Sequence, residues 1–333
     1  MAELAPPADA AAGARRVSRG LVVRLAGLGL AVAVVALLPR LISEYRAFQL
    51  TYVGIYFIAI LGLNILTGYS GQISLGHGAF MALGAYTTAA LTFHAGWRDL
   101  WTIPIAGLVA GAAGFLFGFP ALRFSGVYLA LATFAVAVAT PSVLKRFPGL
   151  TGGSGGLVLD LPEAPFGLAL SPSDWLYYLT WAIALVLLAA AWLLLRGRIG
   201  RAFRAIRSSE VAAVSSGVNL SAYKTLAFGV SAAYAGVAGS LLAIAIAFVN
   251  PDTFPVSLSI LILTGAVVGG LGALIGVVIG ALFIEFLPIY AADVSNQAPA
   301  VIYGVVLIAV MFLLPTGAAG LLRRLLSPFT SRL

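Results

Sequence analysis

The sequence VSLSILILTGAVVGGLGALIGVVIGALFIEFLPI, residues 256–289, contains a single charged residue, Glu285. The run is longer than the roughly 20 residues that one helix needs to cross a bilayer. Gly269 and Gly270 interrupt it near its middle. We therefore divide it into two membrane segments, 256–268 and 271–289, and expect this part of the chain to fold within lipid.

The composition of the whole chain supports the same conclusion. Of the 333 residues, 61% are hydrophobic and 9% are charged, against about 25% charged in ordinary soluble domains. Mean hydropathy is +1.06. A soluble fold needs a polar surface that this composition does not supply. We predict an all-α polytopic membrane protein with about ten membrane segments (8–10).

The remaining apolar stretches give the predicted organisation of the chain. They predict further segments at 25–38, 48–67, 75–95, 101–119, 121–143, 175–195, 225–249 and 298–315. Residues 1–20 and 319–333 are expected to be tails, the first of them disordered, around a transmembrane domain at 21–318. Within that domain, 145–174 is expected to be an external loop and 196–224 a cytoplasmic loop.

The charges agree with an arrangement that has both termini in the cytoplasm. The net charge is +8, and basic residues collect in the cytoplasmic loops of membrane proteins. The basic surplus is therefore interpreted as topology, and nucleic acid is not expected as a partner. With ten segments, these basic residues fall on the inner side: Arg15, Arg16, Arg19, Arg24, Arg123, Arg196, Arg198, Arg201, Arg204, Arg207, Lys224, Arg323, Arg324 and Arg332.

A faint internal repeat suggests that the two halves of the chain are related. Leu66-Thr67-Gly68 recurs as Leu263-Thr264-Gly265, and Gly84-Ala85 recurs as Gly280-Ala281. Transporters often contain inverted repeats with interrupted helices at corresponding positions. In a chain this rich in leucine, glycine and alanine, chance is an equal explanation.

The stretch LTGYSGQISLGHGAFMALGAY, residues 66–86, breaks an apolar region with glycines and polar side chains. Unwound backbone at membrane depth occurs only where it is buried in protein or lines a watery cavity, and its free polar groups can coordinate a solute. The alternative is a tight cytoplasmic turn between two helices. The candidate pathway residues are Gly68, Tyr69, Ser70, Gln72, Ser74 and His77.

The stretch RGRIGRAFRAIRSSEVAAVSSGVNLSAYK, residues 196–224, is the most charged part of the chain. Arg204, Arg207 and Val211 are spaced to share one helix face. Ser208 or Ser209 is expected to cap a second short helix that begins near Glu210 and stops at Gly217, so the segment would form one or two short helices. A compact helix here suits docking into a groove on a cytoplasmic partner, whereas a loop that only sets topology would need no such helix. The candidate coupling residues are Arg204, Arg207, Glu210, Ala212, Ala213, Gly217 and Asn219.

Several other sites are not expected. The chain has no cysteine and two histidines, which are 17 residues apart, so we predict no metal site. Neither lysine is preceded by glycine, so the phosphate-binding Gly-x-x-x-x-Gly-Lys loop is missing and the chain by itself cannot bind ATP in that way. No cofactor is expected on this chain, and no catalytic residue is assigned.

Three stretches of the chain carry a resemblance to a known family. Glu210-x-Ala-Ala-x-x-x-Gly217 resembles the EAA loop of ABC-transporter permeases. Residues 68–86, 204–241 (RAIRSSEVAAVSSGVNLSAYKTLAFGVSAAYAGVAGSL) and 251–281 resemble the branched-chain amino acid permease family, LivM type (the LivH/LivM family). Ser215 and Ser216 depart from the bulkier residues common in that family, and loop 145–174 matches it poorly.

The resemblance implies the permease subunit of an ABC importer in the bacterial cytoplasmic (inner) membrane. Its expected partners are a LivH-type second permease in a heterodimer, two cytoplasmic ATPases that bind ATP, and a periplasmic substrate-binding protein. Branched-chain amino acids are the expected solutes, and urea, short amides or other carboxylates are the alternative.

An ion-coupled secondary transporter that works alone is the alternative from another class. Such coupling usually needs ionisable residues in mid-membrane, and only Glu285, His77 and His94 are available. Glu285 is predicted near the outer end of segment 271–289, where a capping or snorkelling role competes with a functional one.

Overall fold

A computed structural model of the chain describes residues 35, 37–124, 126–160, 162, 170–294, 299–313 and 317–321. The predicted segment 25–38 and both tails lie largely outside these residues. The elements, in chain order, are η1 (Leu38–Arg40), α2 (Glu44–Leu63), η2 (Asn64–Tyr69), α3 (His77–Ala95), α4 (Asp99–Ala121), α5 (Val127–Lys145), α6 (Pro148–Thr151), η3 (Gly153–Gly155), β1 (Leu157–Val158), α7 (Pro172–Arg196), α8 (Arg198–Ser208), α9 (Glu210–Ser215), α10 (Leu220–Ile246), β2 (Phe248–Val249), η5 (Pro251–Thr253), α11 (Val256–Gly269), α12 (Gly276–Val294) and α13 (Pro299–Leu313).

The structure confirms an all-helical membrane protein. Within the described residues, seven segments are long and apolar enough to cross a bilayer: Glu44–Tyr69, Asp99–Ala121, Val127–Lys145, Pro172–Arg196, Leu220–Ile246, Pro251–Gly269 and Val301–Leu321. The apolar helix α12 is shorter by this measure, and α3 is a further helix of 19 residues. The total of ten segments and the side on which each terminus lies remain predictions.

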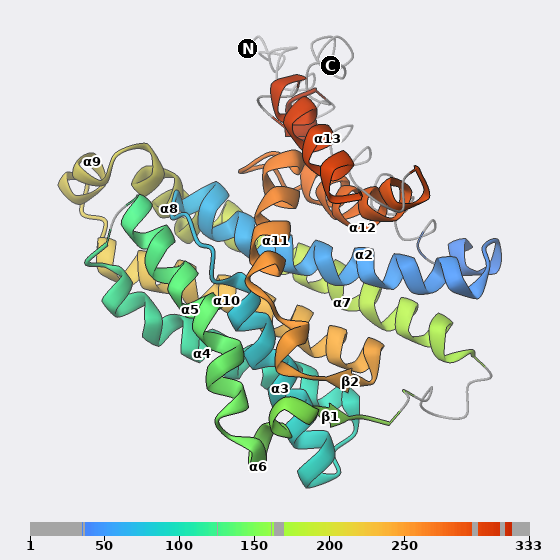
Figure 1. Cartoon of the computed structure of the whole chain (residues 1–333). Coiled ribbons are helices and arrows are strands. Elements are labelled where there is room, and N and C mark those ends of the chain that lie inside the picture. Colours follow the sequence, from blue (N-terminus) through green and yellow to red (C-terminus); the bar gives the residue numbers. More distant parts are fainter. Residues whose placement is uncertain are drawn as a thin grey trace, which may run out of the picture.

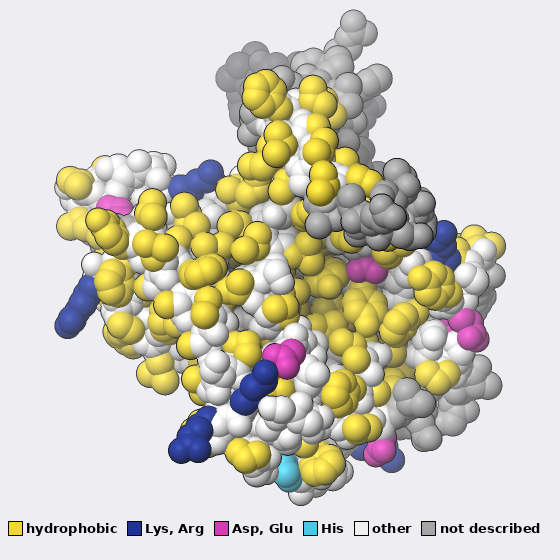
Figure 2. Space-filling model, in the orientation of Figure 1, with side chains coloured by type: hydrophobic (Ala, Val, Ile, Leu, Met, Phe, Trp, Pro, Cys, Tyr) yellow, Lys and Arg dark blue, Asp and Glu magenta, His cyan; other side chains and the backbone are white. Residues whose placement is uncertain are grey.

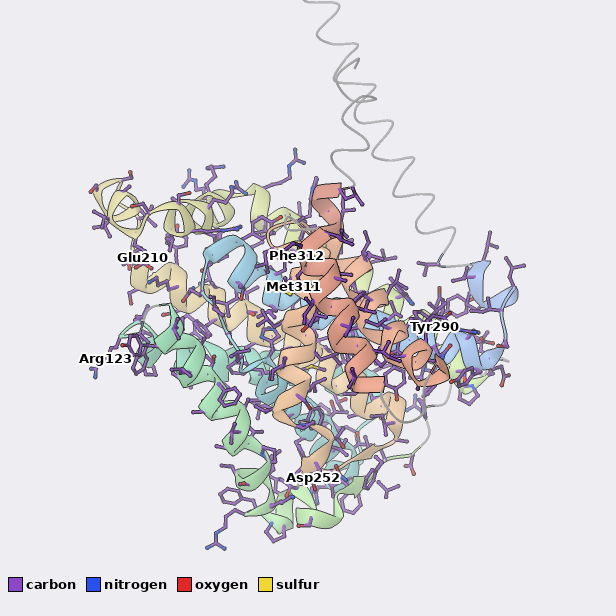
Figure 3. The ribbon with its side chains drawn as sticks, turned by 45° about the horizontal axis from the view of Figure 1, so that its top comes forward. Arg123, Glu210, Asp252, Tyr290, Met311 and Phe312 are labelled. Carbon is purple, nitrogen blue, oxygen red and sulfur yellow. The ribbon has the colours of Figure 1, made fainter. Side chains whose placement is uncertain are left out.

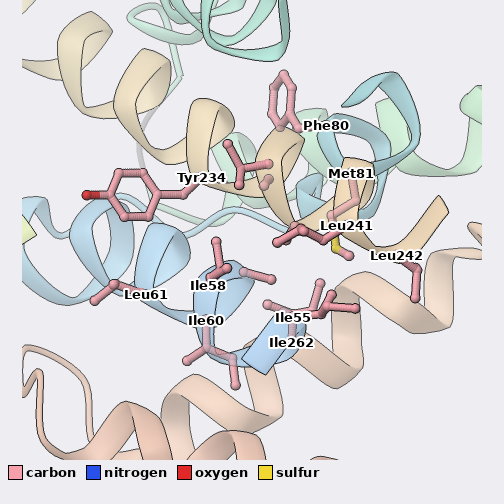
Figure 4. Close-up of a cluster of buried hydrophobic side chains, with 14 of the residues drawn as sticks. Ile55, Ile58, Ile60, Leu61, Phe80, Met81, Tyr234, Leu241, Leu242 and Ile262 are labelled. Carbon is pink, nitrogen blue, oxygen red and sulfur yellow. The ribbon is translucent and has the colours of Figure 1, made fainter. Parts of the chain in front are cut away.

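Helices α2 and α10 form the centre of the molecule. Both are apolar around their whole circumference and are largely buried, and α10 packs against α2, α3 and α4. Side chains from α2, α3, α10 and α11 interdigitate in the core, among them Ile58, Met81, Leu241 and Ile262 (Figure 4). The backbones of α3 and α10 touch, because a Cβ atom at Gly84 would lie 2.1 Å from the carbonyl oxygen of Gly236. Glycines in such helices allow close packing in lipid.

Charged and irregular elements gather at two opposite ends. The α8–α9 end holds those two helices, and the β1–β2 end holds α6 and a two-stranded antiparallel ribbon in which Leu157 pairs with Val249 (Figure 1). Glu210 and Asp252 mark these two ends in Figure 3. At the β1–β2 end, Lys145 Nζ lies 2.8 Å from Asp252 Oδ1.

The sides between the two ends are hydrophobic. Large apolar side chains on the outer faces of α4, α5, α7 and α13 are exposed, including Leu108, Leu131, Val186 and Phe312. The surface view shows hydrophobic side chains covering much of one side (Figure 2). A lipid environment accounts for this exposure, since soluble monomers rarely carry apolar patches of this extent.

The division of the long apolar run at Gly269-Gly270 matches the structure. Helix α11 ends at Gly269, and α12 begins at Gly276. The expected position of Glu285 near a helix end was wrong, because α12 begins later and continues to Val294. Glu285 therefore lies midway along its helix. Pro288 occurs within this helix and does not end it.

Candidate coupling and translocation site

Helix α8 lies against the body of the protein at the α8–α9 end. Its apolar side is buried through Ala202, Phe203 and Ile206, and the ring of Phe203 packs edge-on against Tyr223 of α10 at 6.4 Å. Its arginines lie on the exposed side. The alternation of arginine with apolar residues thus produces a helix that is anchored on one face and charged on the other.

The charged segment forms two helices, separated at Ser209. Ser209 adopts an extended conformation (φ −164°), and its hydroxyl accepts a hydrogen bond from the Ala212 amide at 3.3 Å. The predicted cap is therefore correct, and the prediction that Val211 continues the face of Arg204 and Arg207 is wrong. The capped helix is preferred because the serine side chain satisfies an amide that would otherwise lack a partner.

Helix α9 ends where the sequence predicts. Gly217 has φ +79°, a conformation that favours glycine, and the Val218 amide bonds back to the Ala213 carbonyl at 3.0 Å. Asn219 then caps α10, since its Oδ1 accepts from the Ala222 amide at 3.0 Å. The short helix is thus fixed at both ends.

Helix α9 presents a mixed surface to solvent. Glu210 Oε1 lies 2.7 Å from Lys224 Nζ of α10, and about half of the Glu210 side chain stays exposed. The side chain of Ala213 is buried, whereas Ala212 is exposed. Val211 and Val214 are 79% and 54% exposed. An acid and two valines on a projecting helix form a small amphipathic surface.

The second informative stretch is an unwound segment inside the protein. The α2 helix continues into a π-helical turn, η2, which is a feature often found at functional sites. Residues 71–76 then form neither helix nor strand. Of its polar side chains, Ser70, Gln72 and Ser74 are buried. The polar side chains of this connection are thus enclosed, whereas Gly71 and Ile73 are exposed.

Side chains of neighbouring helices hold this unwound segment. Thr133, in the second turn of α5, accepts a hydrogen bond from the Leu75 amide at 2.9 Å. Ser259, in the first turn of α11, accepts from the Gly78 amide at 2.8 Å. The start of α11 follows directly from β2 and η5 of the β1–β2 end. Because the first turn of α3 bonds to the first turn of α11, α3 begins away from the α8–α9 end, and its first residue, His77, is buried.

The predicted pathway residues Ser70, Gln72 and Ser74 form hydrogen bonds with each other and with adjacent residues. Thr67 Oγ1 donates to the Gln72 carbonyl at 2.9 Å, and Gln72 Nε2 donates to Ser70 Oγ at 2.6 Å. Ser74 Oγ accepts from the Gly76 amide at 3.3 Å. These contacts satisfy polar groups that would be costly to leave unpaired at this depth. Tyr69 is half-buried at the end of the π-helical turn.

His77 begins α3 and is fully enclosed. Its Nε2 lies 3.4 Å from Ser231 Oγ of α10, and its Nδ1 is buried without a hydrogen-bond partner among the described residues. Within the same residues, no group of three His, Cys, Asp or Glu side chains is placed to hold a metal ion.

Arg207 joins the two informative stretches. A guanidinium nitrogen, Nη1, donates to the Gly68 carbonyl in the π-helical turn. The aliphatic part of the arginine packs against Gly71, and its guanidinium lies against Gly272, between α11 and α12. One side chain of α8 thus contacts both helix interruptions.

Asn64 joins the two interruptions directly. Its Oδ1 accepts from the Gly272 amide at 2.7 Å, and its Nδ2 donates to the Ala273 carbonyl at 3.1 Å. Gly68 and Gly272 are so close that a Cβ at Gly68 would lie 2.4 Å from the Gly272 nitrogen. We call Asn64, Gly68, Arg207 and Gly272 the junction.

The sequence reasoning did not find Asn64, Thr133 or Ser259. Each is a polar residue within a predicted apolar segment, and a buried polar residue in a membrane helix is a signal for a specific contact. Their partners, however, lie between 58 and 209 residues away along the chain.

Comparison with known proteins identifies the family. The family model described as branched-chain amino acid transport system, permease component, matches residues 45–314. The chain belongs to this family. The chain is 37% identical to the high-affinity branched-chain amino acid transport system permease protein LivM of Escherichia coli (strain K12) over 272 aligned residues. The alignment covers 74% of this chain and 63% of the relative. It thus spans less than two thirds of that relative's length.

Two more distant relatives are also transport permeases by name. The branched-chain amino acid permease protein LivH of Salmonella typhimurium (strain LT2) is 26% identical, over 80% of this chain and 91% of its own length. The autoinducer 2 import system permease protein LsrC of Escherichia coli (strain K12 / DH10B) is 31% identical, over 63% of each chain. No solved structure matches this chain.

Proposed function

We propose that this chain is the transmembrane permease subunit of an ABC importer that moves branched-chain amino acids across the bacterial cytoplasmic membrane. It would pair with a LivH-type second permease, receive solute from a periplasmic binding protein, and be driven by two cytoplasmic ATPases that hold the ATP. The proposal is supported by the family membership and by the contact of Arg207 with the unwound segment.

The arrangement of α8 and α9 suggests how ATP hydrolysis would reach the membrane segments. Helix α9 exposes Glu210, Val211 and Val214 for a partner. Helix α8, one residue before it, contacts both helix interruptions through Arg207. If an ATPase moves α8 and α9, the carbonyl of Gly68 and the backbone at Gly272 are displaced with them. Alternating access then requires that the ATPases favour one position of α8 when ATP is bound and another when it is not.

Reconstitution tests the proposal. The chain, its second permease, both ATPases and the binding protein would be placed in proteoliposomes and supplied with radiolabelled leucine. We expect uptake to require ATP inside the vesicle and to survive a protonophore. Uptake that persists without ATP and disappears with the protonophore would instead support the ion-coupled alternative.

The solute is tested separately. Competition of leucine uptake by isoleucine and valine, but not by urea or short amides, is expected. The reverse pattern would keep the ABC importer and replace its solute with the alternative class.

A further inference from the structure

The corner between α7 and α8, residues 192–204, carries an unbalanced positive charge. It contains four arginines and no acidic residue. Arg196 ends α7, and Arg198 begins α8 after a single glycine, Gly197. Both arginines are exposed, as is Arg201 one turn later. Basic side chains are visible at the α8–α9 end of the molecule (Figure 2). Three guanidinium groups thus share a short stretch of surface.

The four arginines of α8 divide into two pairs by their partners. Successive members are three residues apart, and each step turns the position by about 60° around the helix. Arg207 and Arg204 donate to backbone carbonyls of η2 and α7. Arg201 and Arg198 lie at the opposite edge of the charged side, and within the described residues their guanidinium groups have no hydrogen-bond or ion-pair partner. This second pair can therefore bind a ligand from outside the chain.

The surface next to these arginines is the apolar outer side of α7. Trp192 and Leu193, in the last two turns of α7, are exposed. The guanidinium group of Arg196 lies 4.3 Å from the centre of the Trp192 ring. Tryptophan is enriched at the level of the lipid headgroups, and the apolar side of α7 ends at Arg196. The corner therefore lies where the acyl chains of the bilayer meet the headgroups.

The corner is tight, which keeps the arginines beside the end of α7. Gly200 lies so close to the Leu195 carbonyl that no Cβ atom would fit between them. Arg204 Nη1 donates to the same carbonyl at 3.2 Å. The start of α8 cannot move away from α7 without losing these contacts, so Arg198 and Arg201 stay close to the apolar surface.

We propose that Arg196, Arg198 and Arg201 form a binding site for the phosphate group of an anionic phospholipid. A guanidinium group can donate to two phosphate oxygens at once. The exposed side chains of Trp192 and Leu193 would contact the acyl chains of the same molecule. A soluble partner would leave these two side chains uncovered, because they belong to the side of α7 that faces lipid. The bound lipid would hold the start of α8 at the surface of the bilayer.

The test measures binding of phosphatidylglycerol to the purified full chain in detergent. Arg198→Gln combined with Arg201→Gln removes two charges at exposed positions. One basic residue near a membrane surface contributes about fivefold to the affinity for anionic lipid, so the dissociation constant should rise about 25-fold. Arg146→Gln, the same change at an exposed position of the β1–β2 end, is the matched control and should bind normally. Phosphatidylcholine, which has a phosphate but no net charge, should bind weakly to all of these proteins.

A charge-conserving variant separates loss of the site from loss of the fold. Arg198→Lys combined with Arg201→Lys should keep most of the affinity for phosphatidylglycerol. Equal affinity of the double glutamine variant and the unaltered chain would overturn the site, and so would equal binding of phosphatidylcholine. Loss of the ATPases from the complex purified with the double glutamine variant would show that these arginines dock a protein, which would also overturn it. Lipid binding is measured on the chain alone, so the proposed function can fail without affecting this result.

Discussion

Arg207 is the residue through which α8 contacts the helix interruptions, and its removal is the most direct test of coupling. Hydrogen bonds that involve a charged group contribute about 1.5–3 kcal/mol. If this contact differs between the transport states, Arg207→Ala should lower leucine uptake about tenfold or more while ATP hydrolysis continues. The measurement is the number of leucine molecules moved per ATP hydrolysed in proteoliposomes.

Arg204 supplies the control for this prediction. It is also an exposed arginine of α8, but it donates to the Leu195 carbonyl at the end of α7, away from the junction. Although the sequence placed Arg204 among the candidate coupling residues, this contact lies within the α7–α8 corner. Arg204→Ala should therefore leave the number of leucine molecules moved per ATP nearly unchanged. A similar loss in both variants would show that the charge of α8, and not the contact with Gly68, matters.

Glu210 has two candidate roles that a charge exchange separates. It pairs with Lys224 within the chain, and it is partly exposed to a partner. Glu210→Lys should uncouple ATP hydrolysis from uptake. Because the variant also leaves the nearly buried Lys224 without its partner, the amount of folded protein is measured alongside.

The double variant Glu210→Lys with Lys224→Glu restores an ion pair with its charges reversed. If Glu210 contacts an ATPase, uptake should stay low in the double variant. Full recovery of uptake would contradict the docking role and would leave the pairing with Lys224 as the function of Glu210.

The residue-level predictions succeeded where the physical cause is local. Ser209 and Gly217 lie at helix ends, and capping rules need only neighbouring residues. The partner of Asn64 lies 208 residues away, and no pattern within one segment specifies such a contact. Arg207 was predicted as a coupling residue, but its contact with Gly68 depends on how α8 lies against η2.

At the level of elements, the contact between α3 and α10 decides stability. A Cβ at Gly84 would meet the backbone of α10. Gly84→Ala should therefore force the two helices apart, at a cost of about 1–3 kcal/mol. Gly304→Ala in α13, where a Cβ meets no atom within 4 Å, should be neutral. Thermal unfolding of the purified protein, followed by loss of monodisperse material, compares the two.

The elements themselves were largely predictable because apolar runs define membrane helices. Gly269-Gly270 marked a true interruption, and the unwound stretch after Gly68 was expected from its glycines and polar residues. The late start of α12 was not predictable from the sequence. Residues Leu271–Ile275 are apolar and continue the hydropathy pattern, although they are not helical. Hydropathy reports burial in lipid or protein, whichever backbone conformation the residues adopt.

At the scale of the whole molecule, the proposed function requires companions. Gentle purification of the tagged chain from its native host should recover a second permease and two ATPases with it. Recovery of the chain alone, still able to move leucine, would contradict the importer assignment. Composition alone predicted a membrane protein. The number of membrane segments and the side of the membrane on which each terminus lies were inferred from the placement of charges, and the fold does not test them.

Helix α10 connects the two ends of the molecule without a break. Near its start, Lys224 holds Glu210 of α9, and just after its end, the Ala247 carbonyl accepts from the Leu159 amide beside the ribbon at 2.8 Å. Its 27 residues form a rod of ~40 Å. The helix pair α8–α9 is therefore joined to the far ribbon by one continuous helix, and to the helix interruptions at Gly68 and Gly272 by the Arg207 side chain. Both connections begin at the same short helix pair.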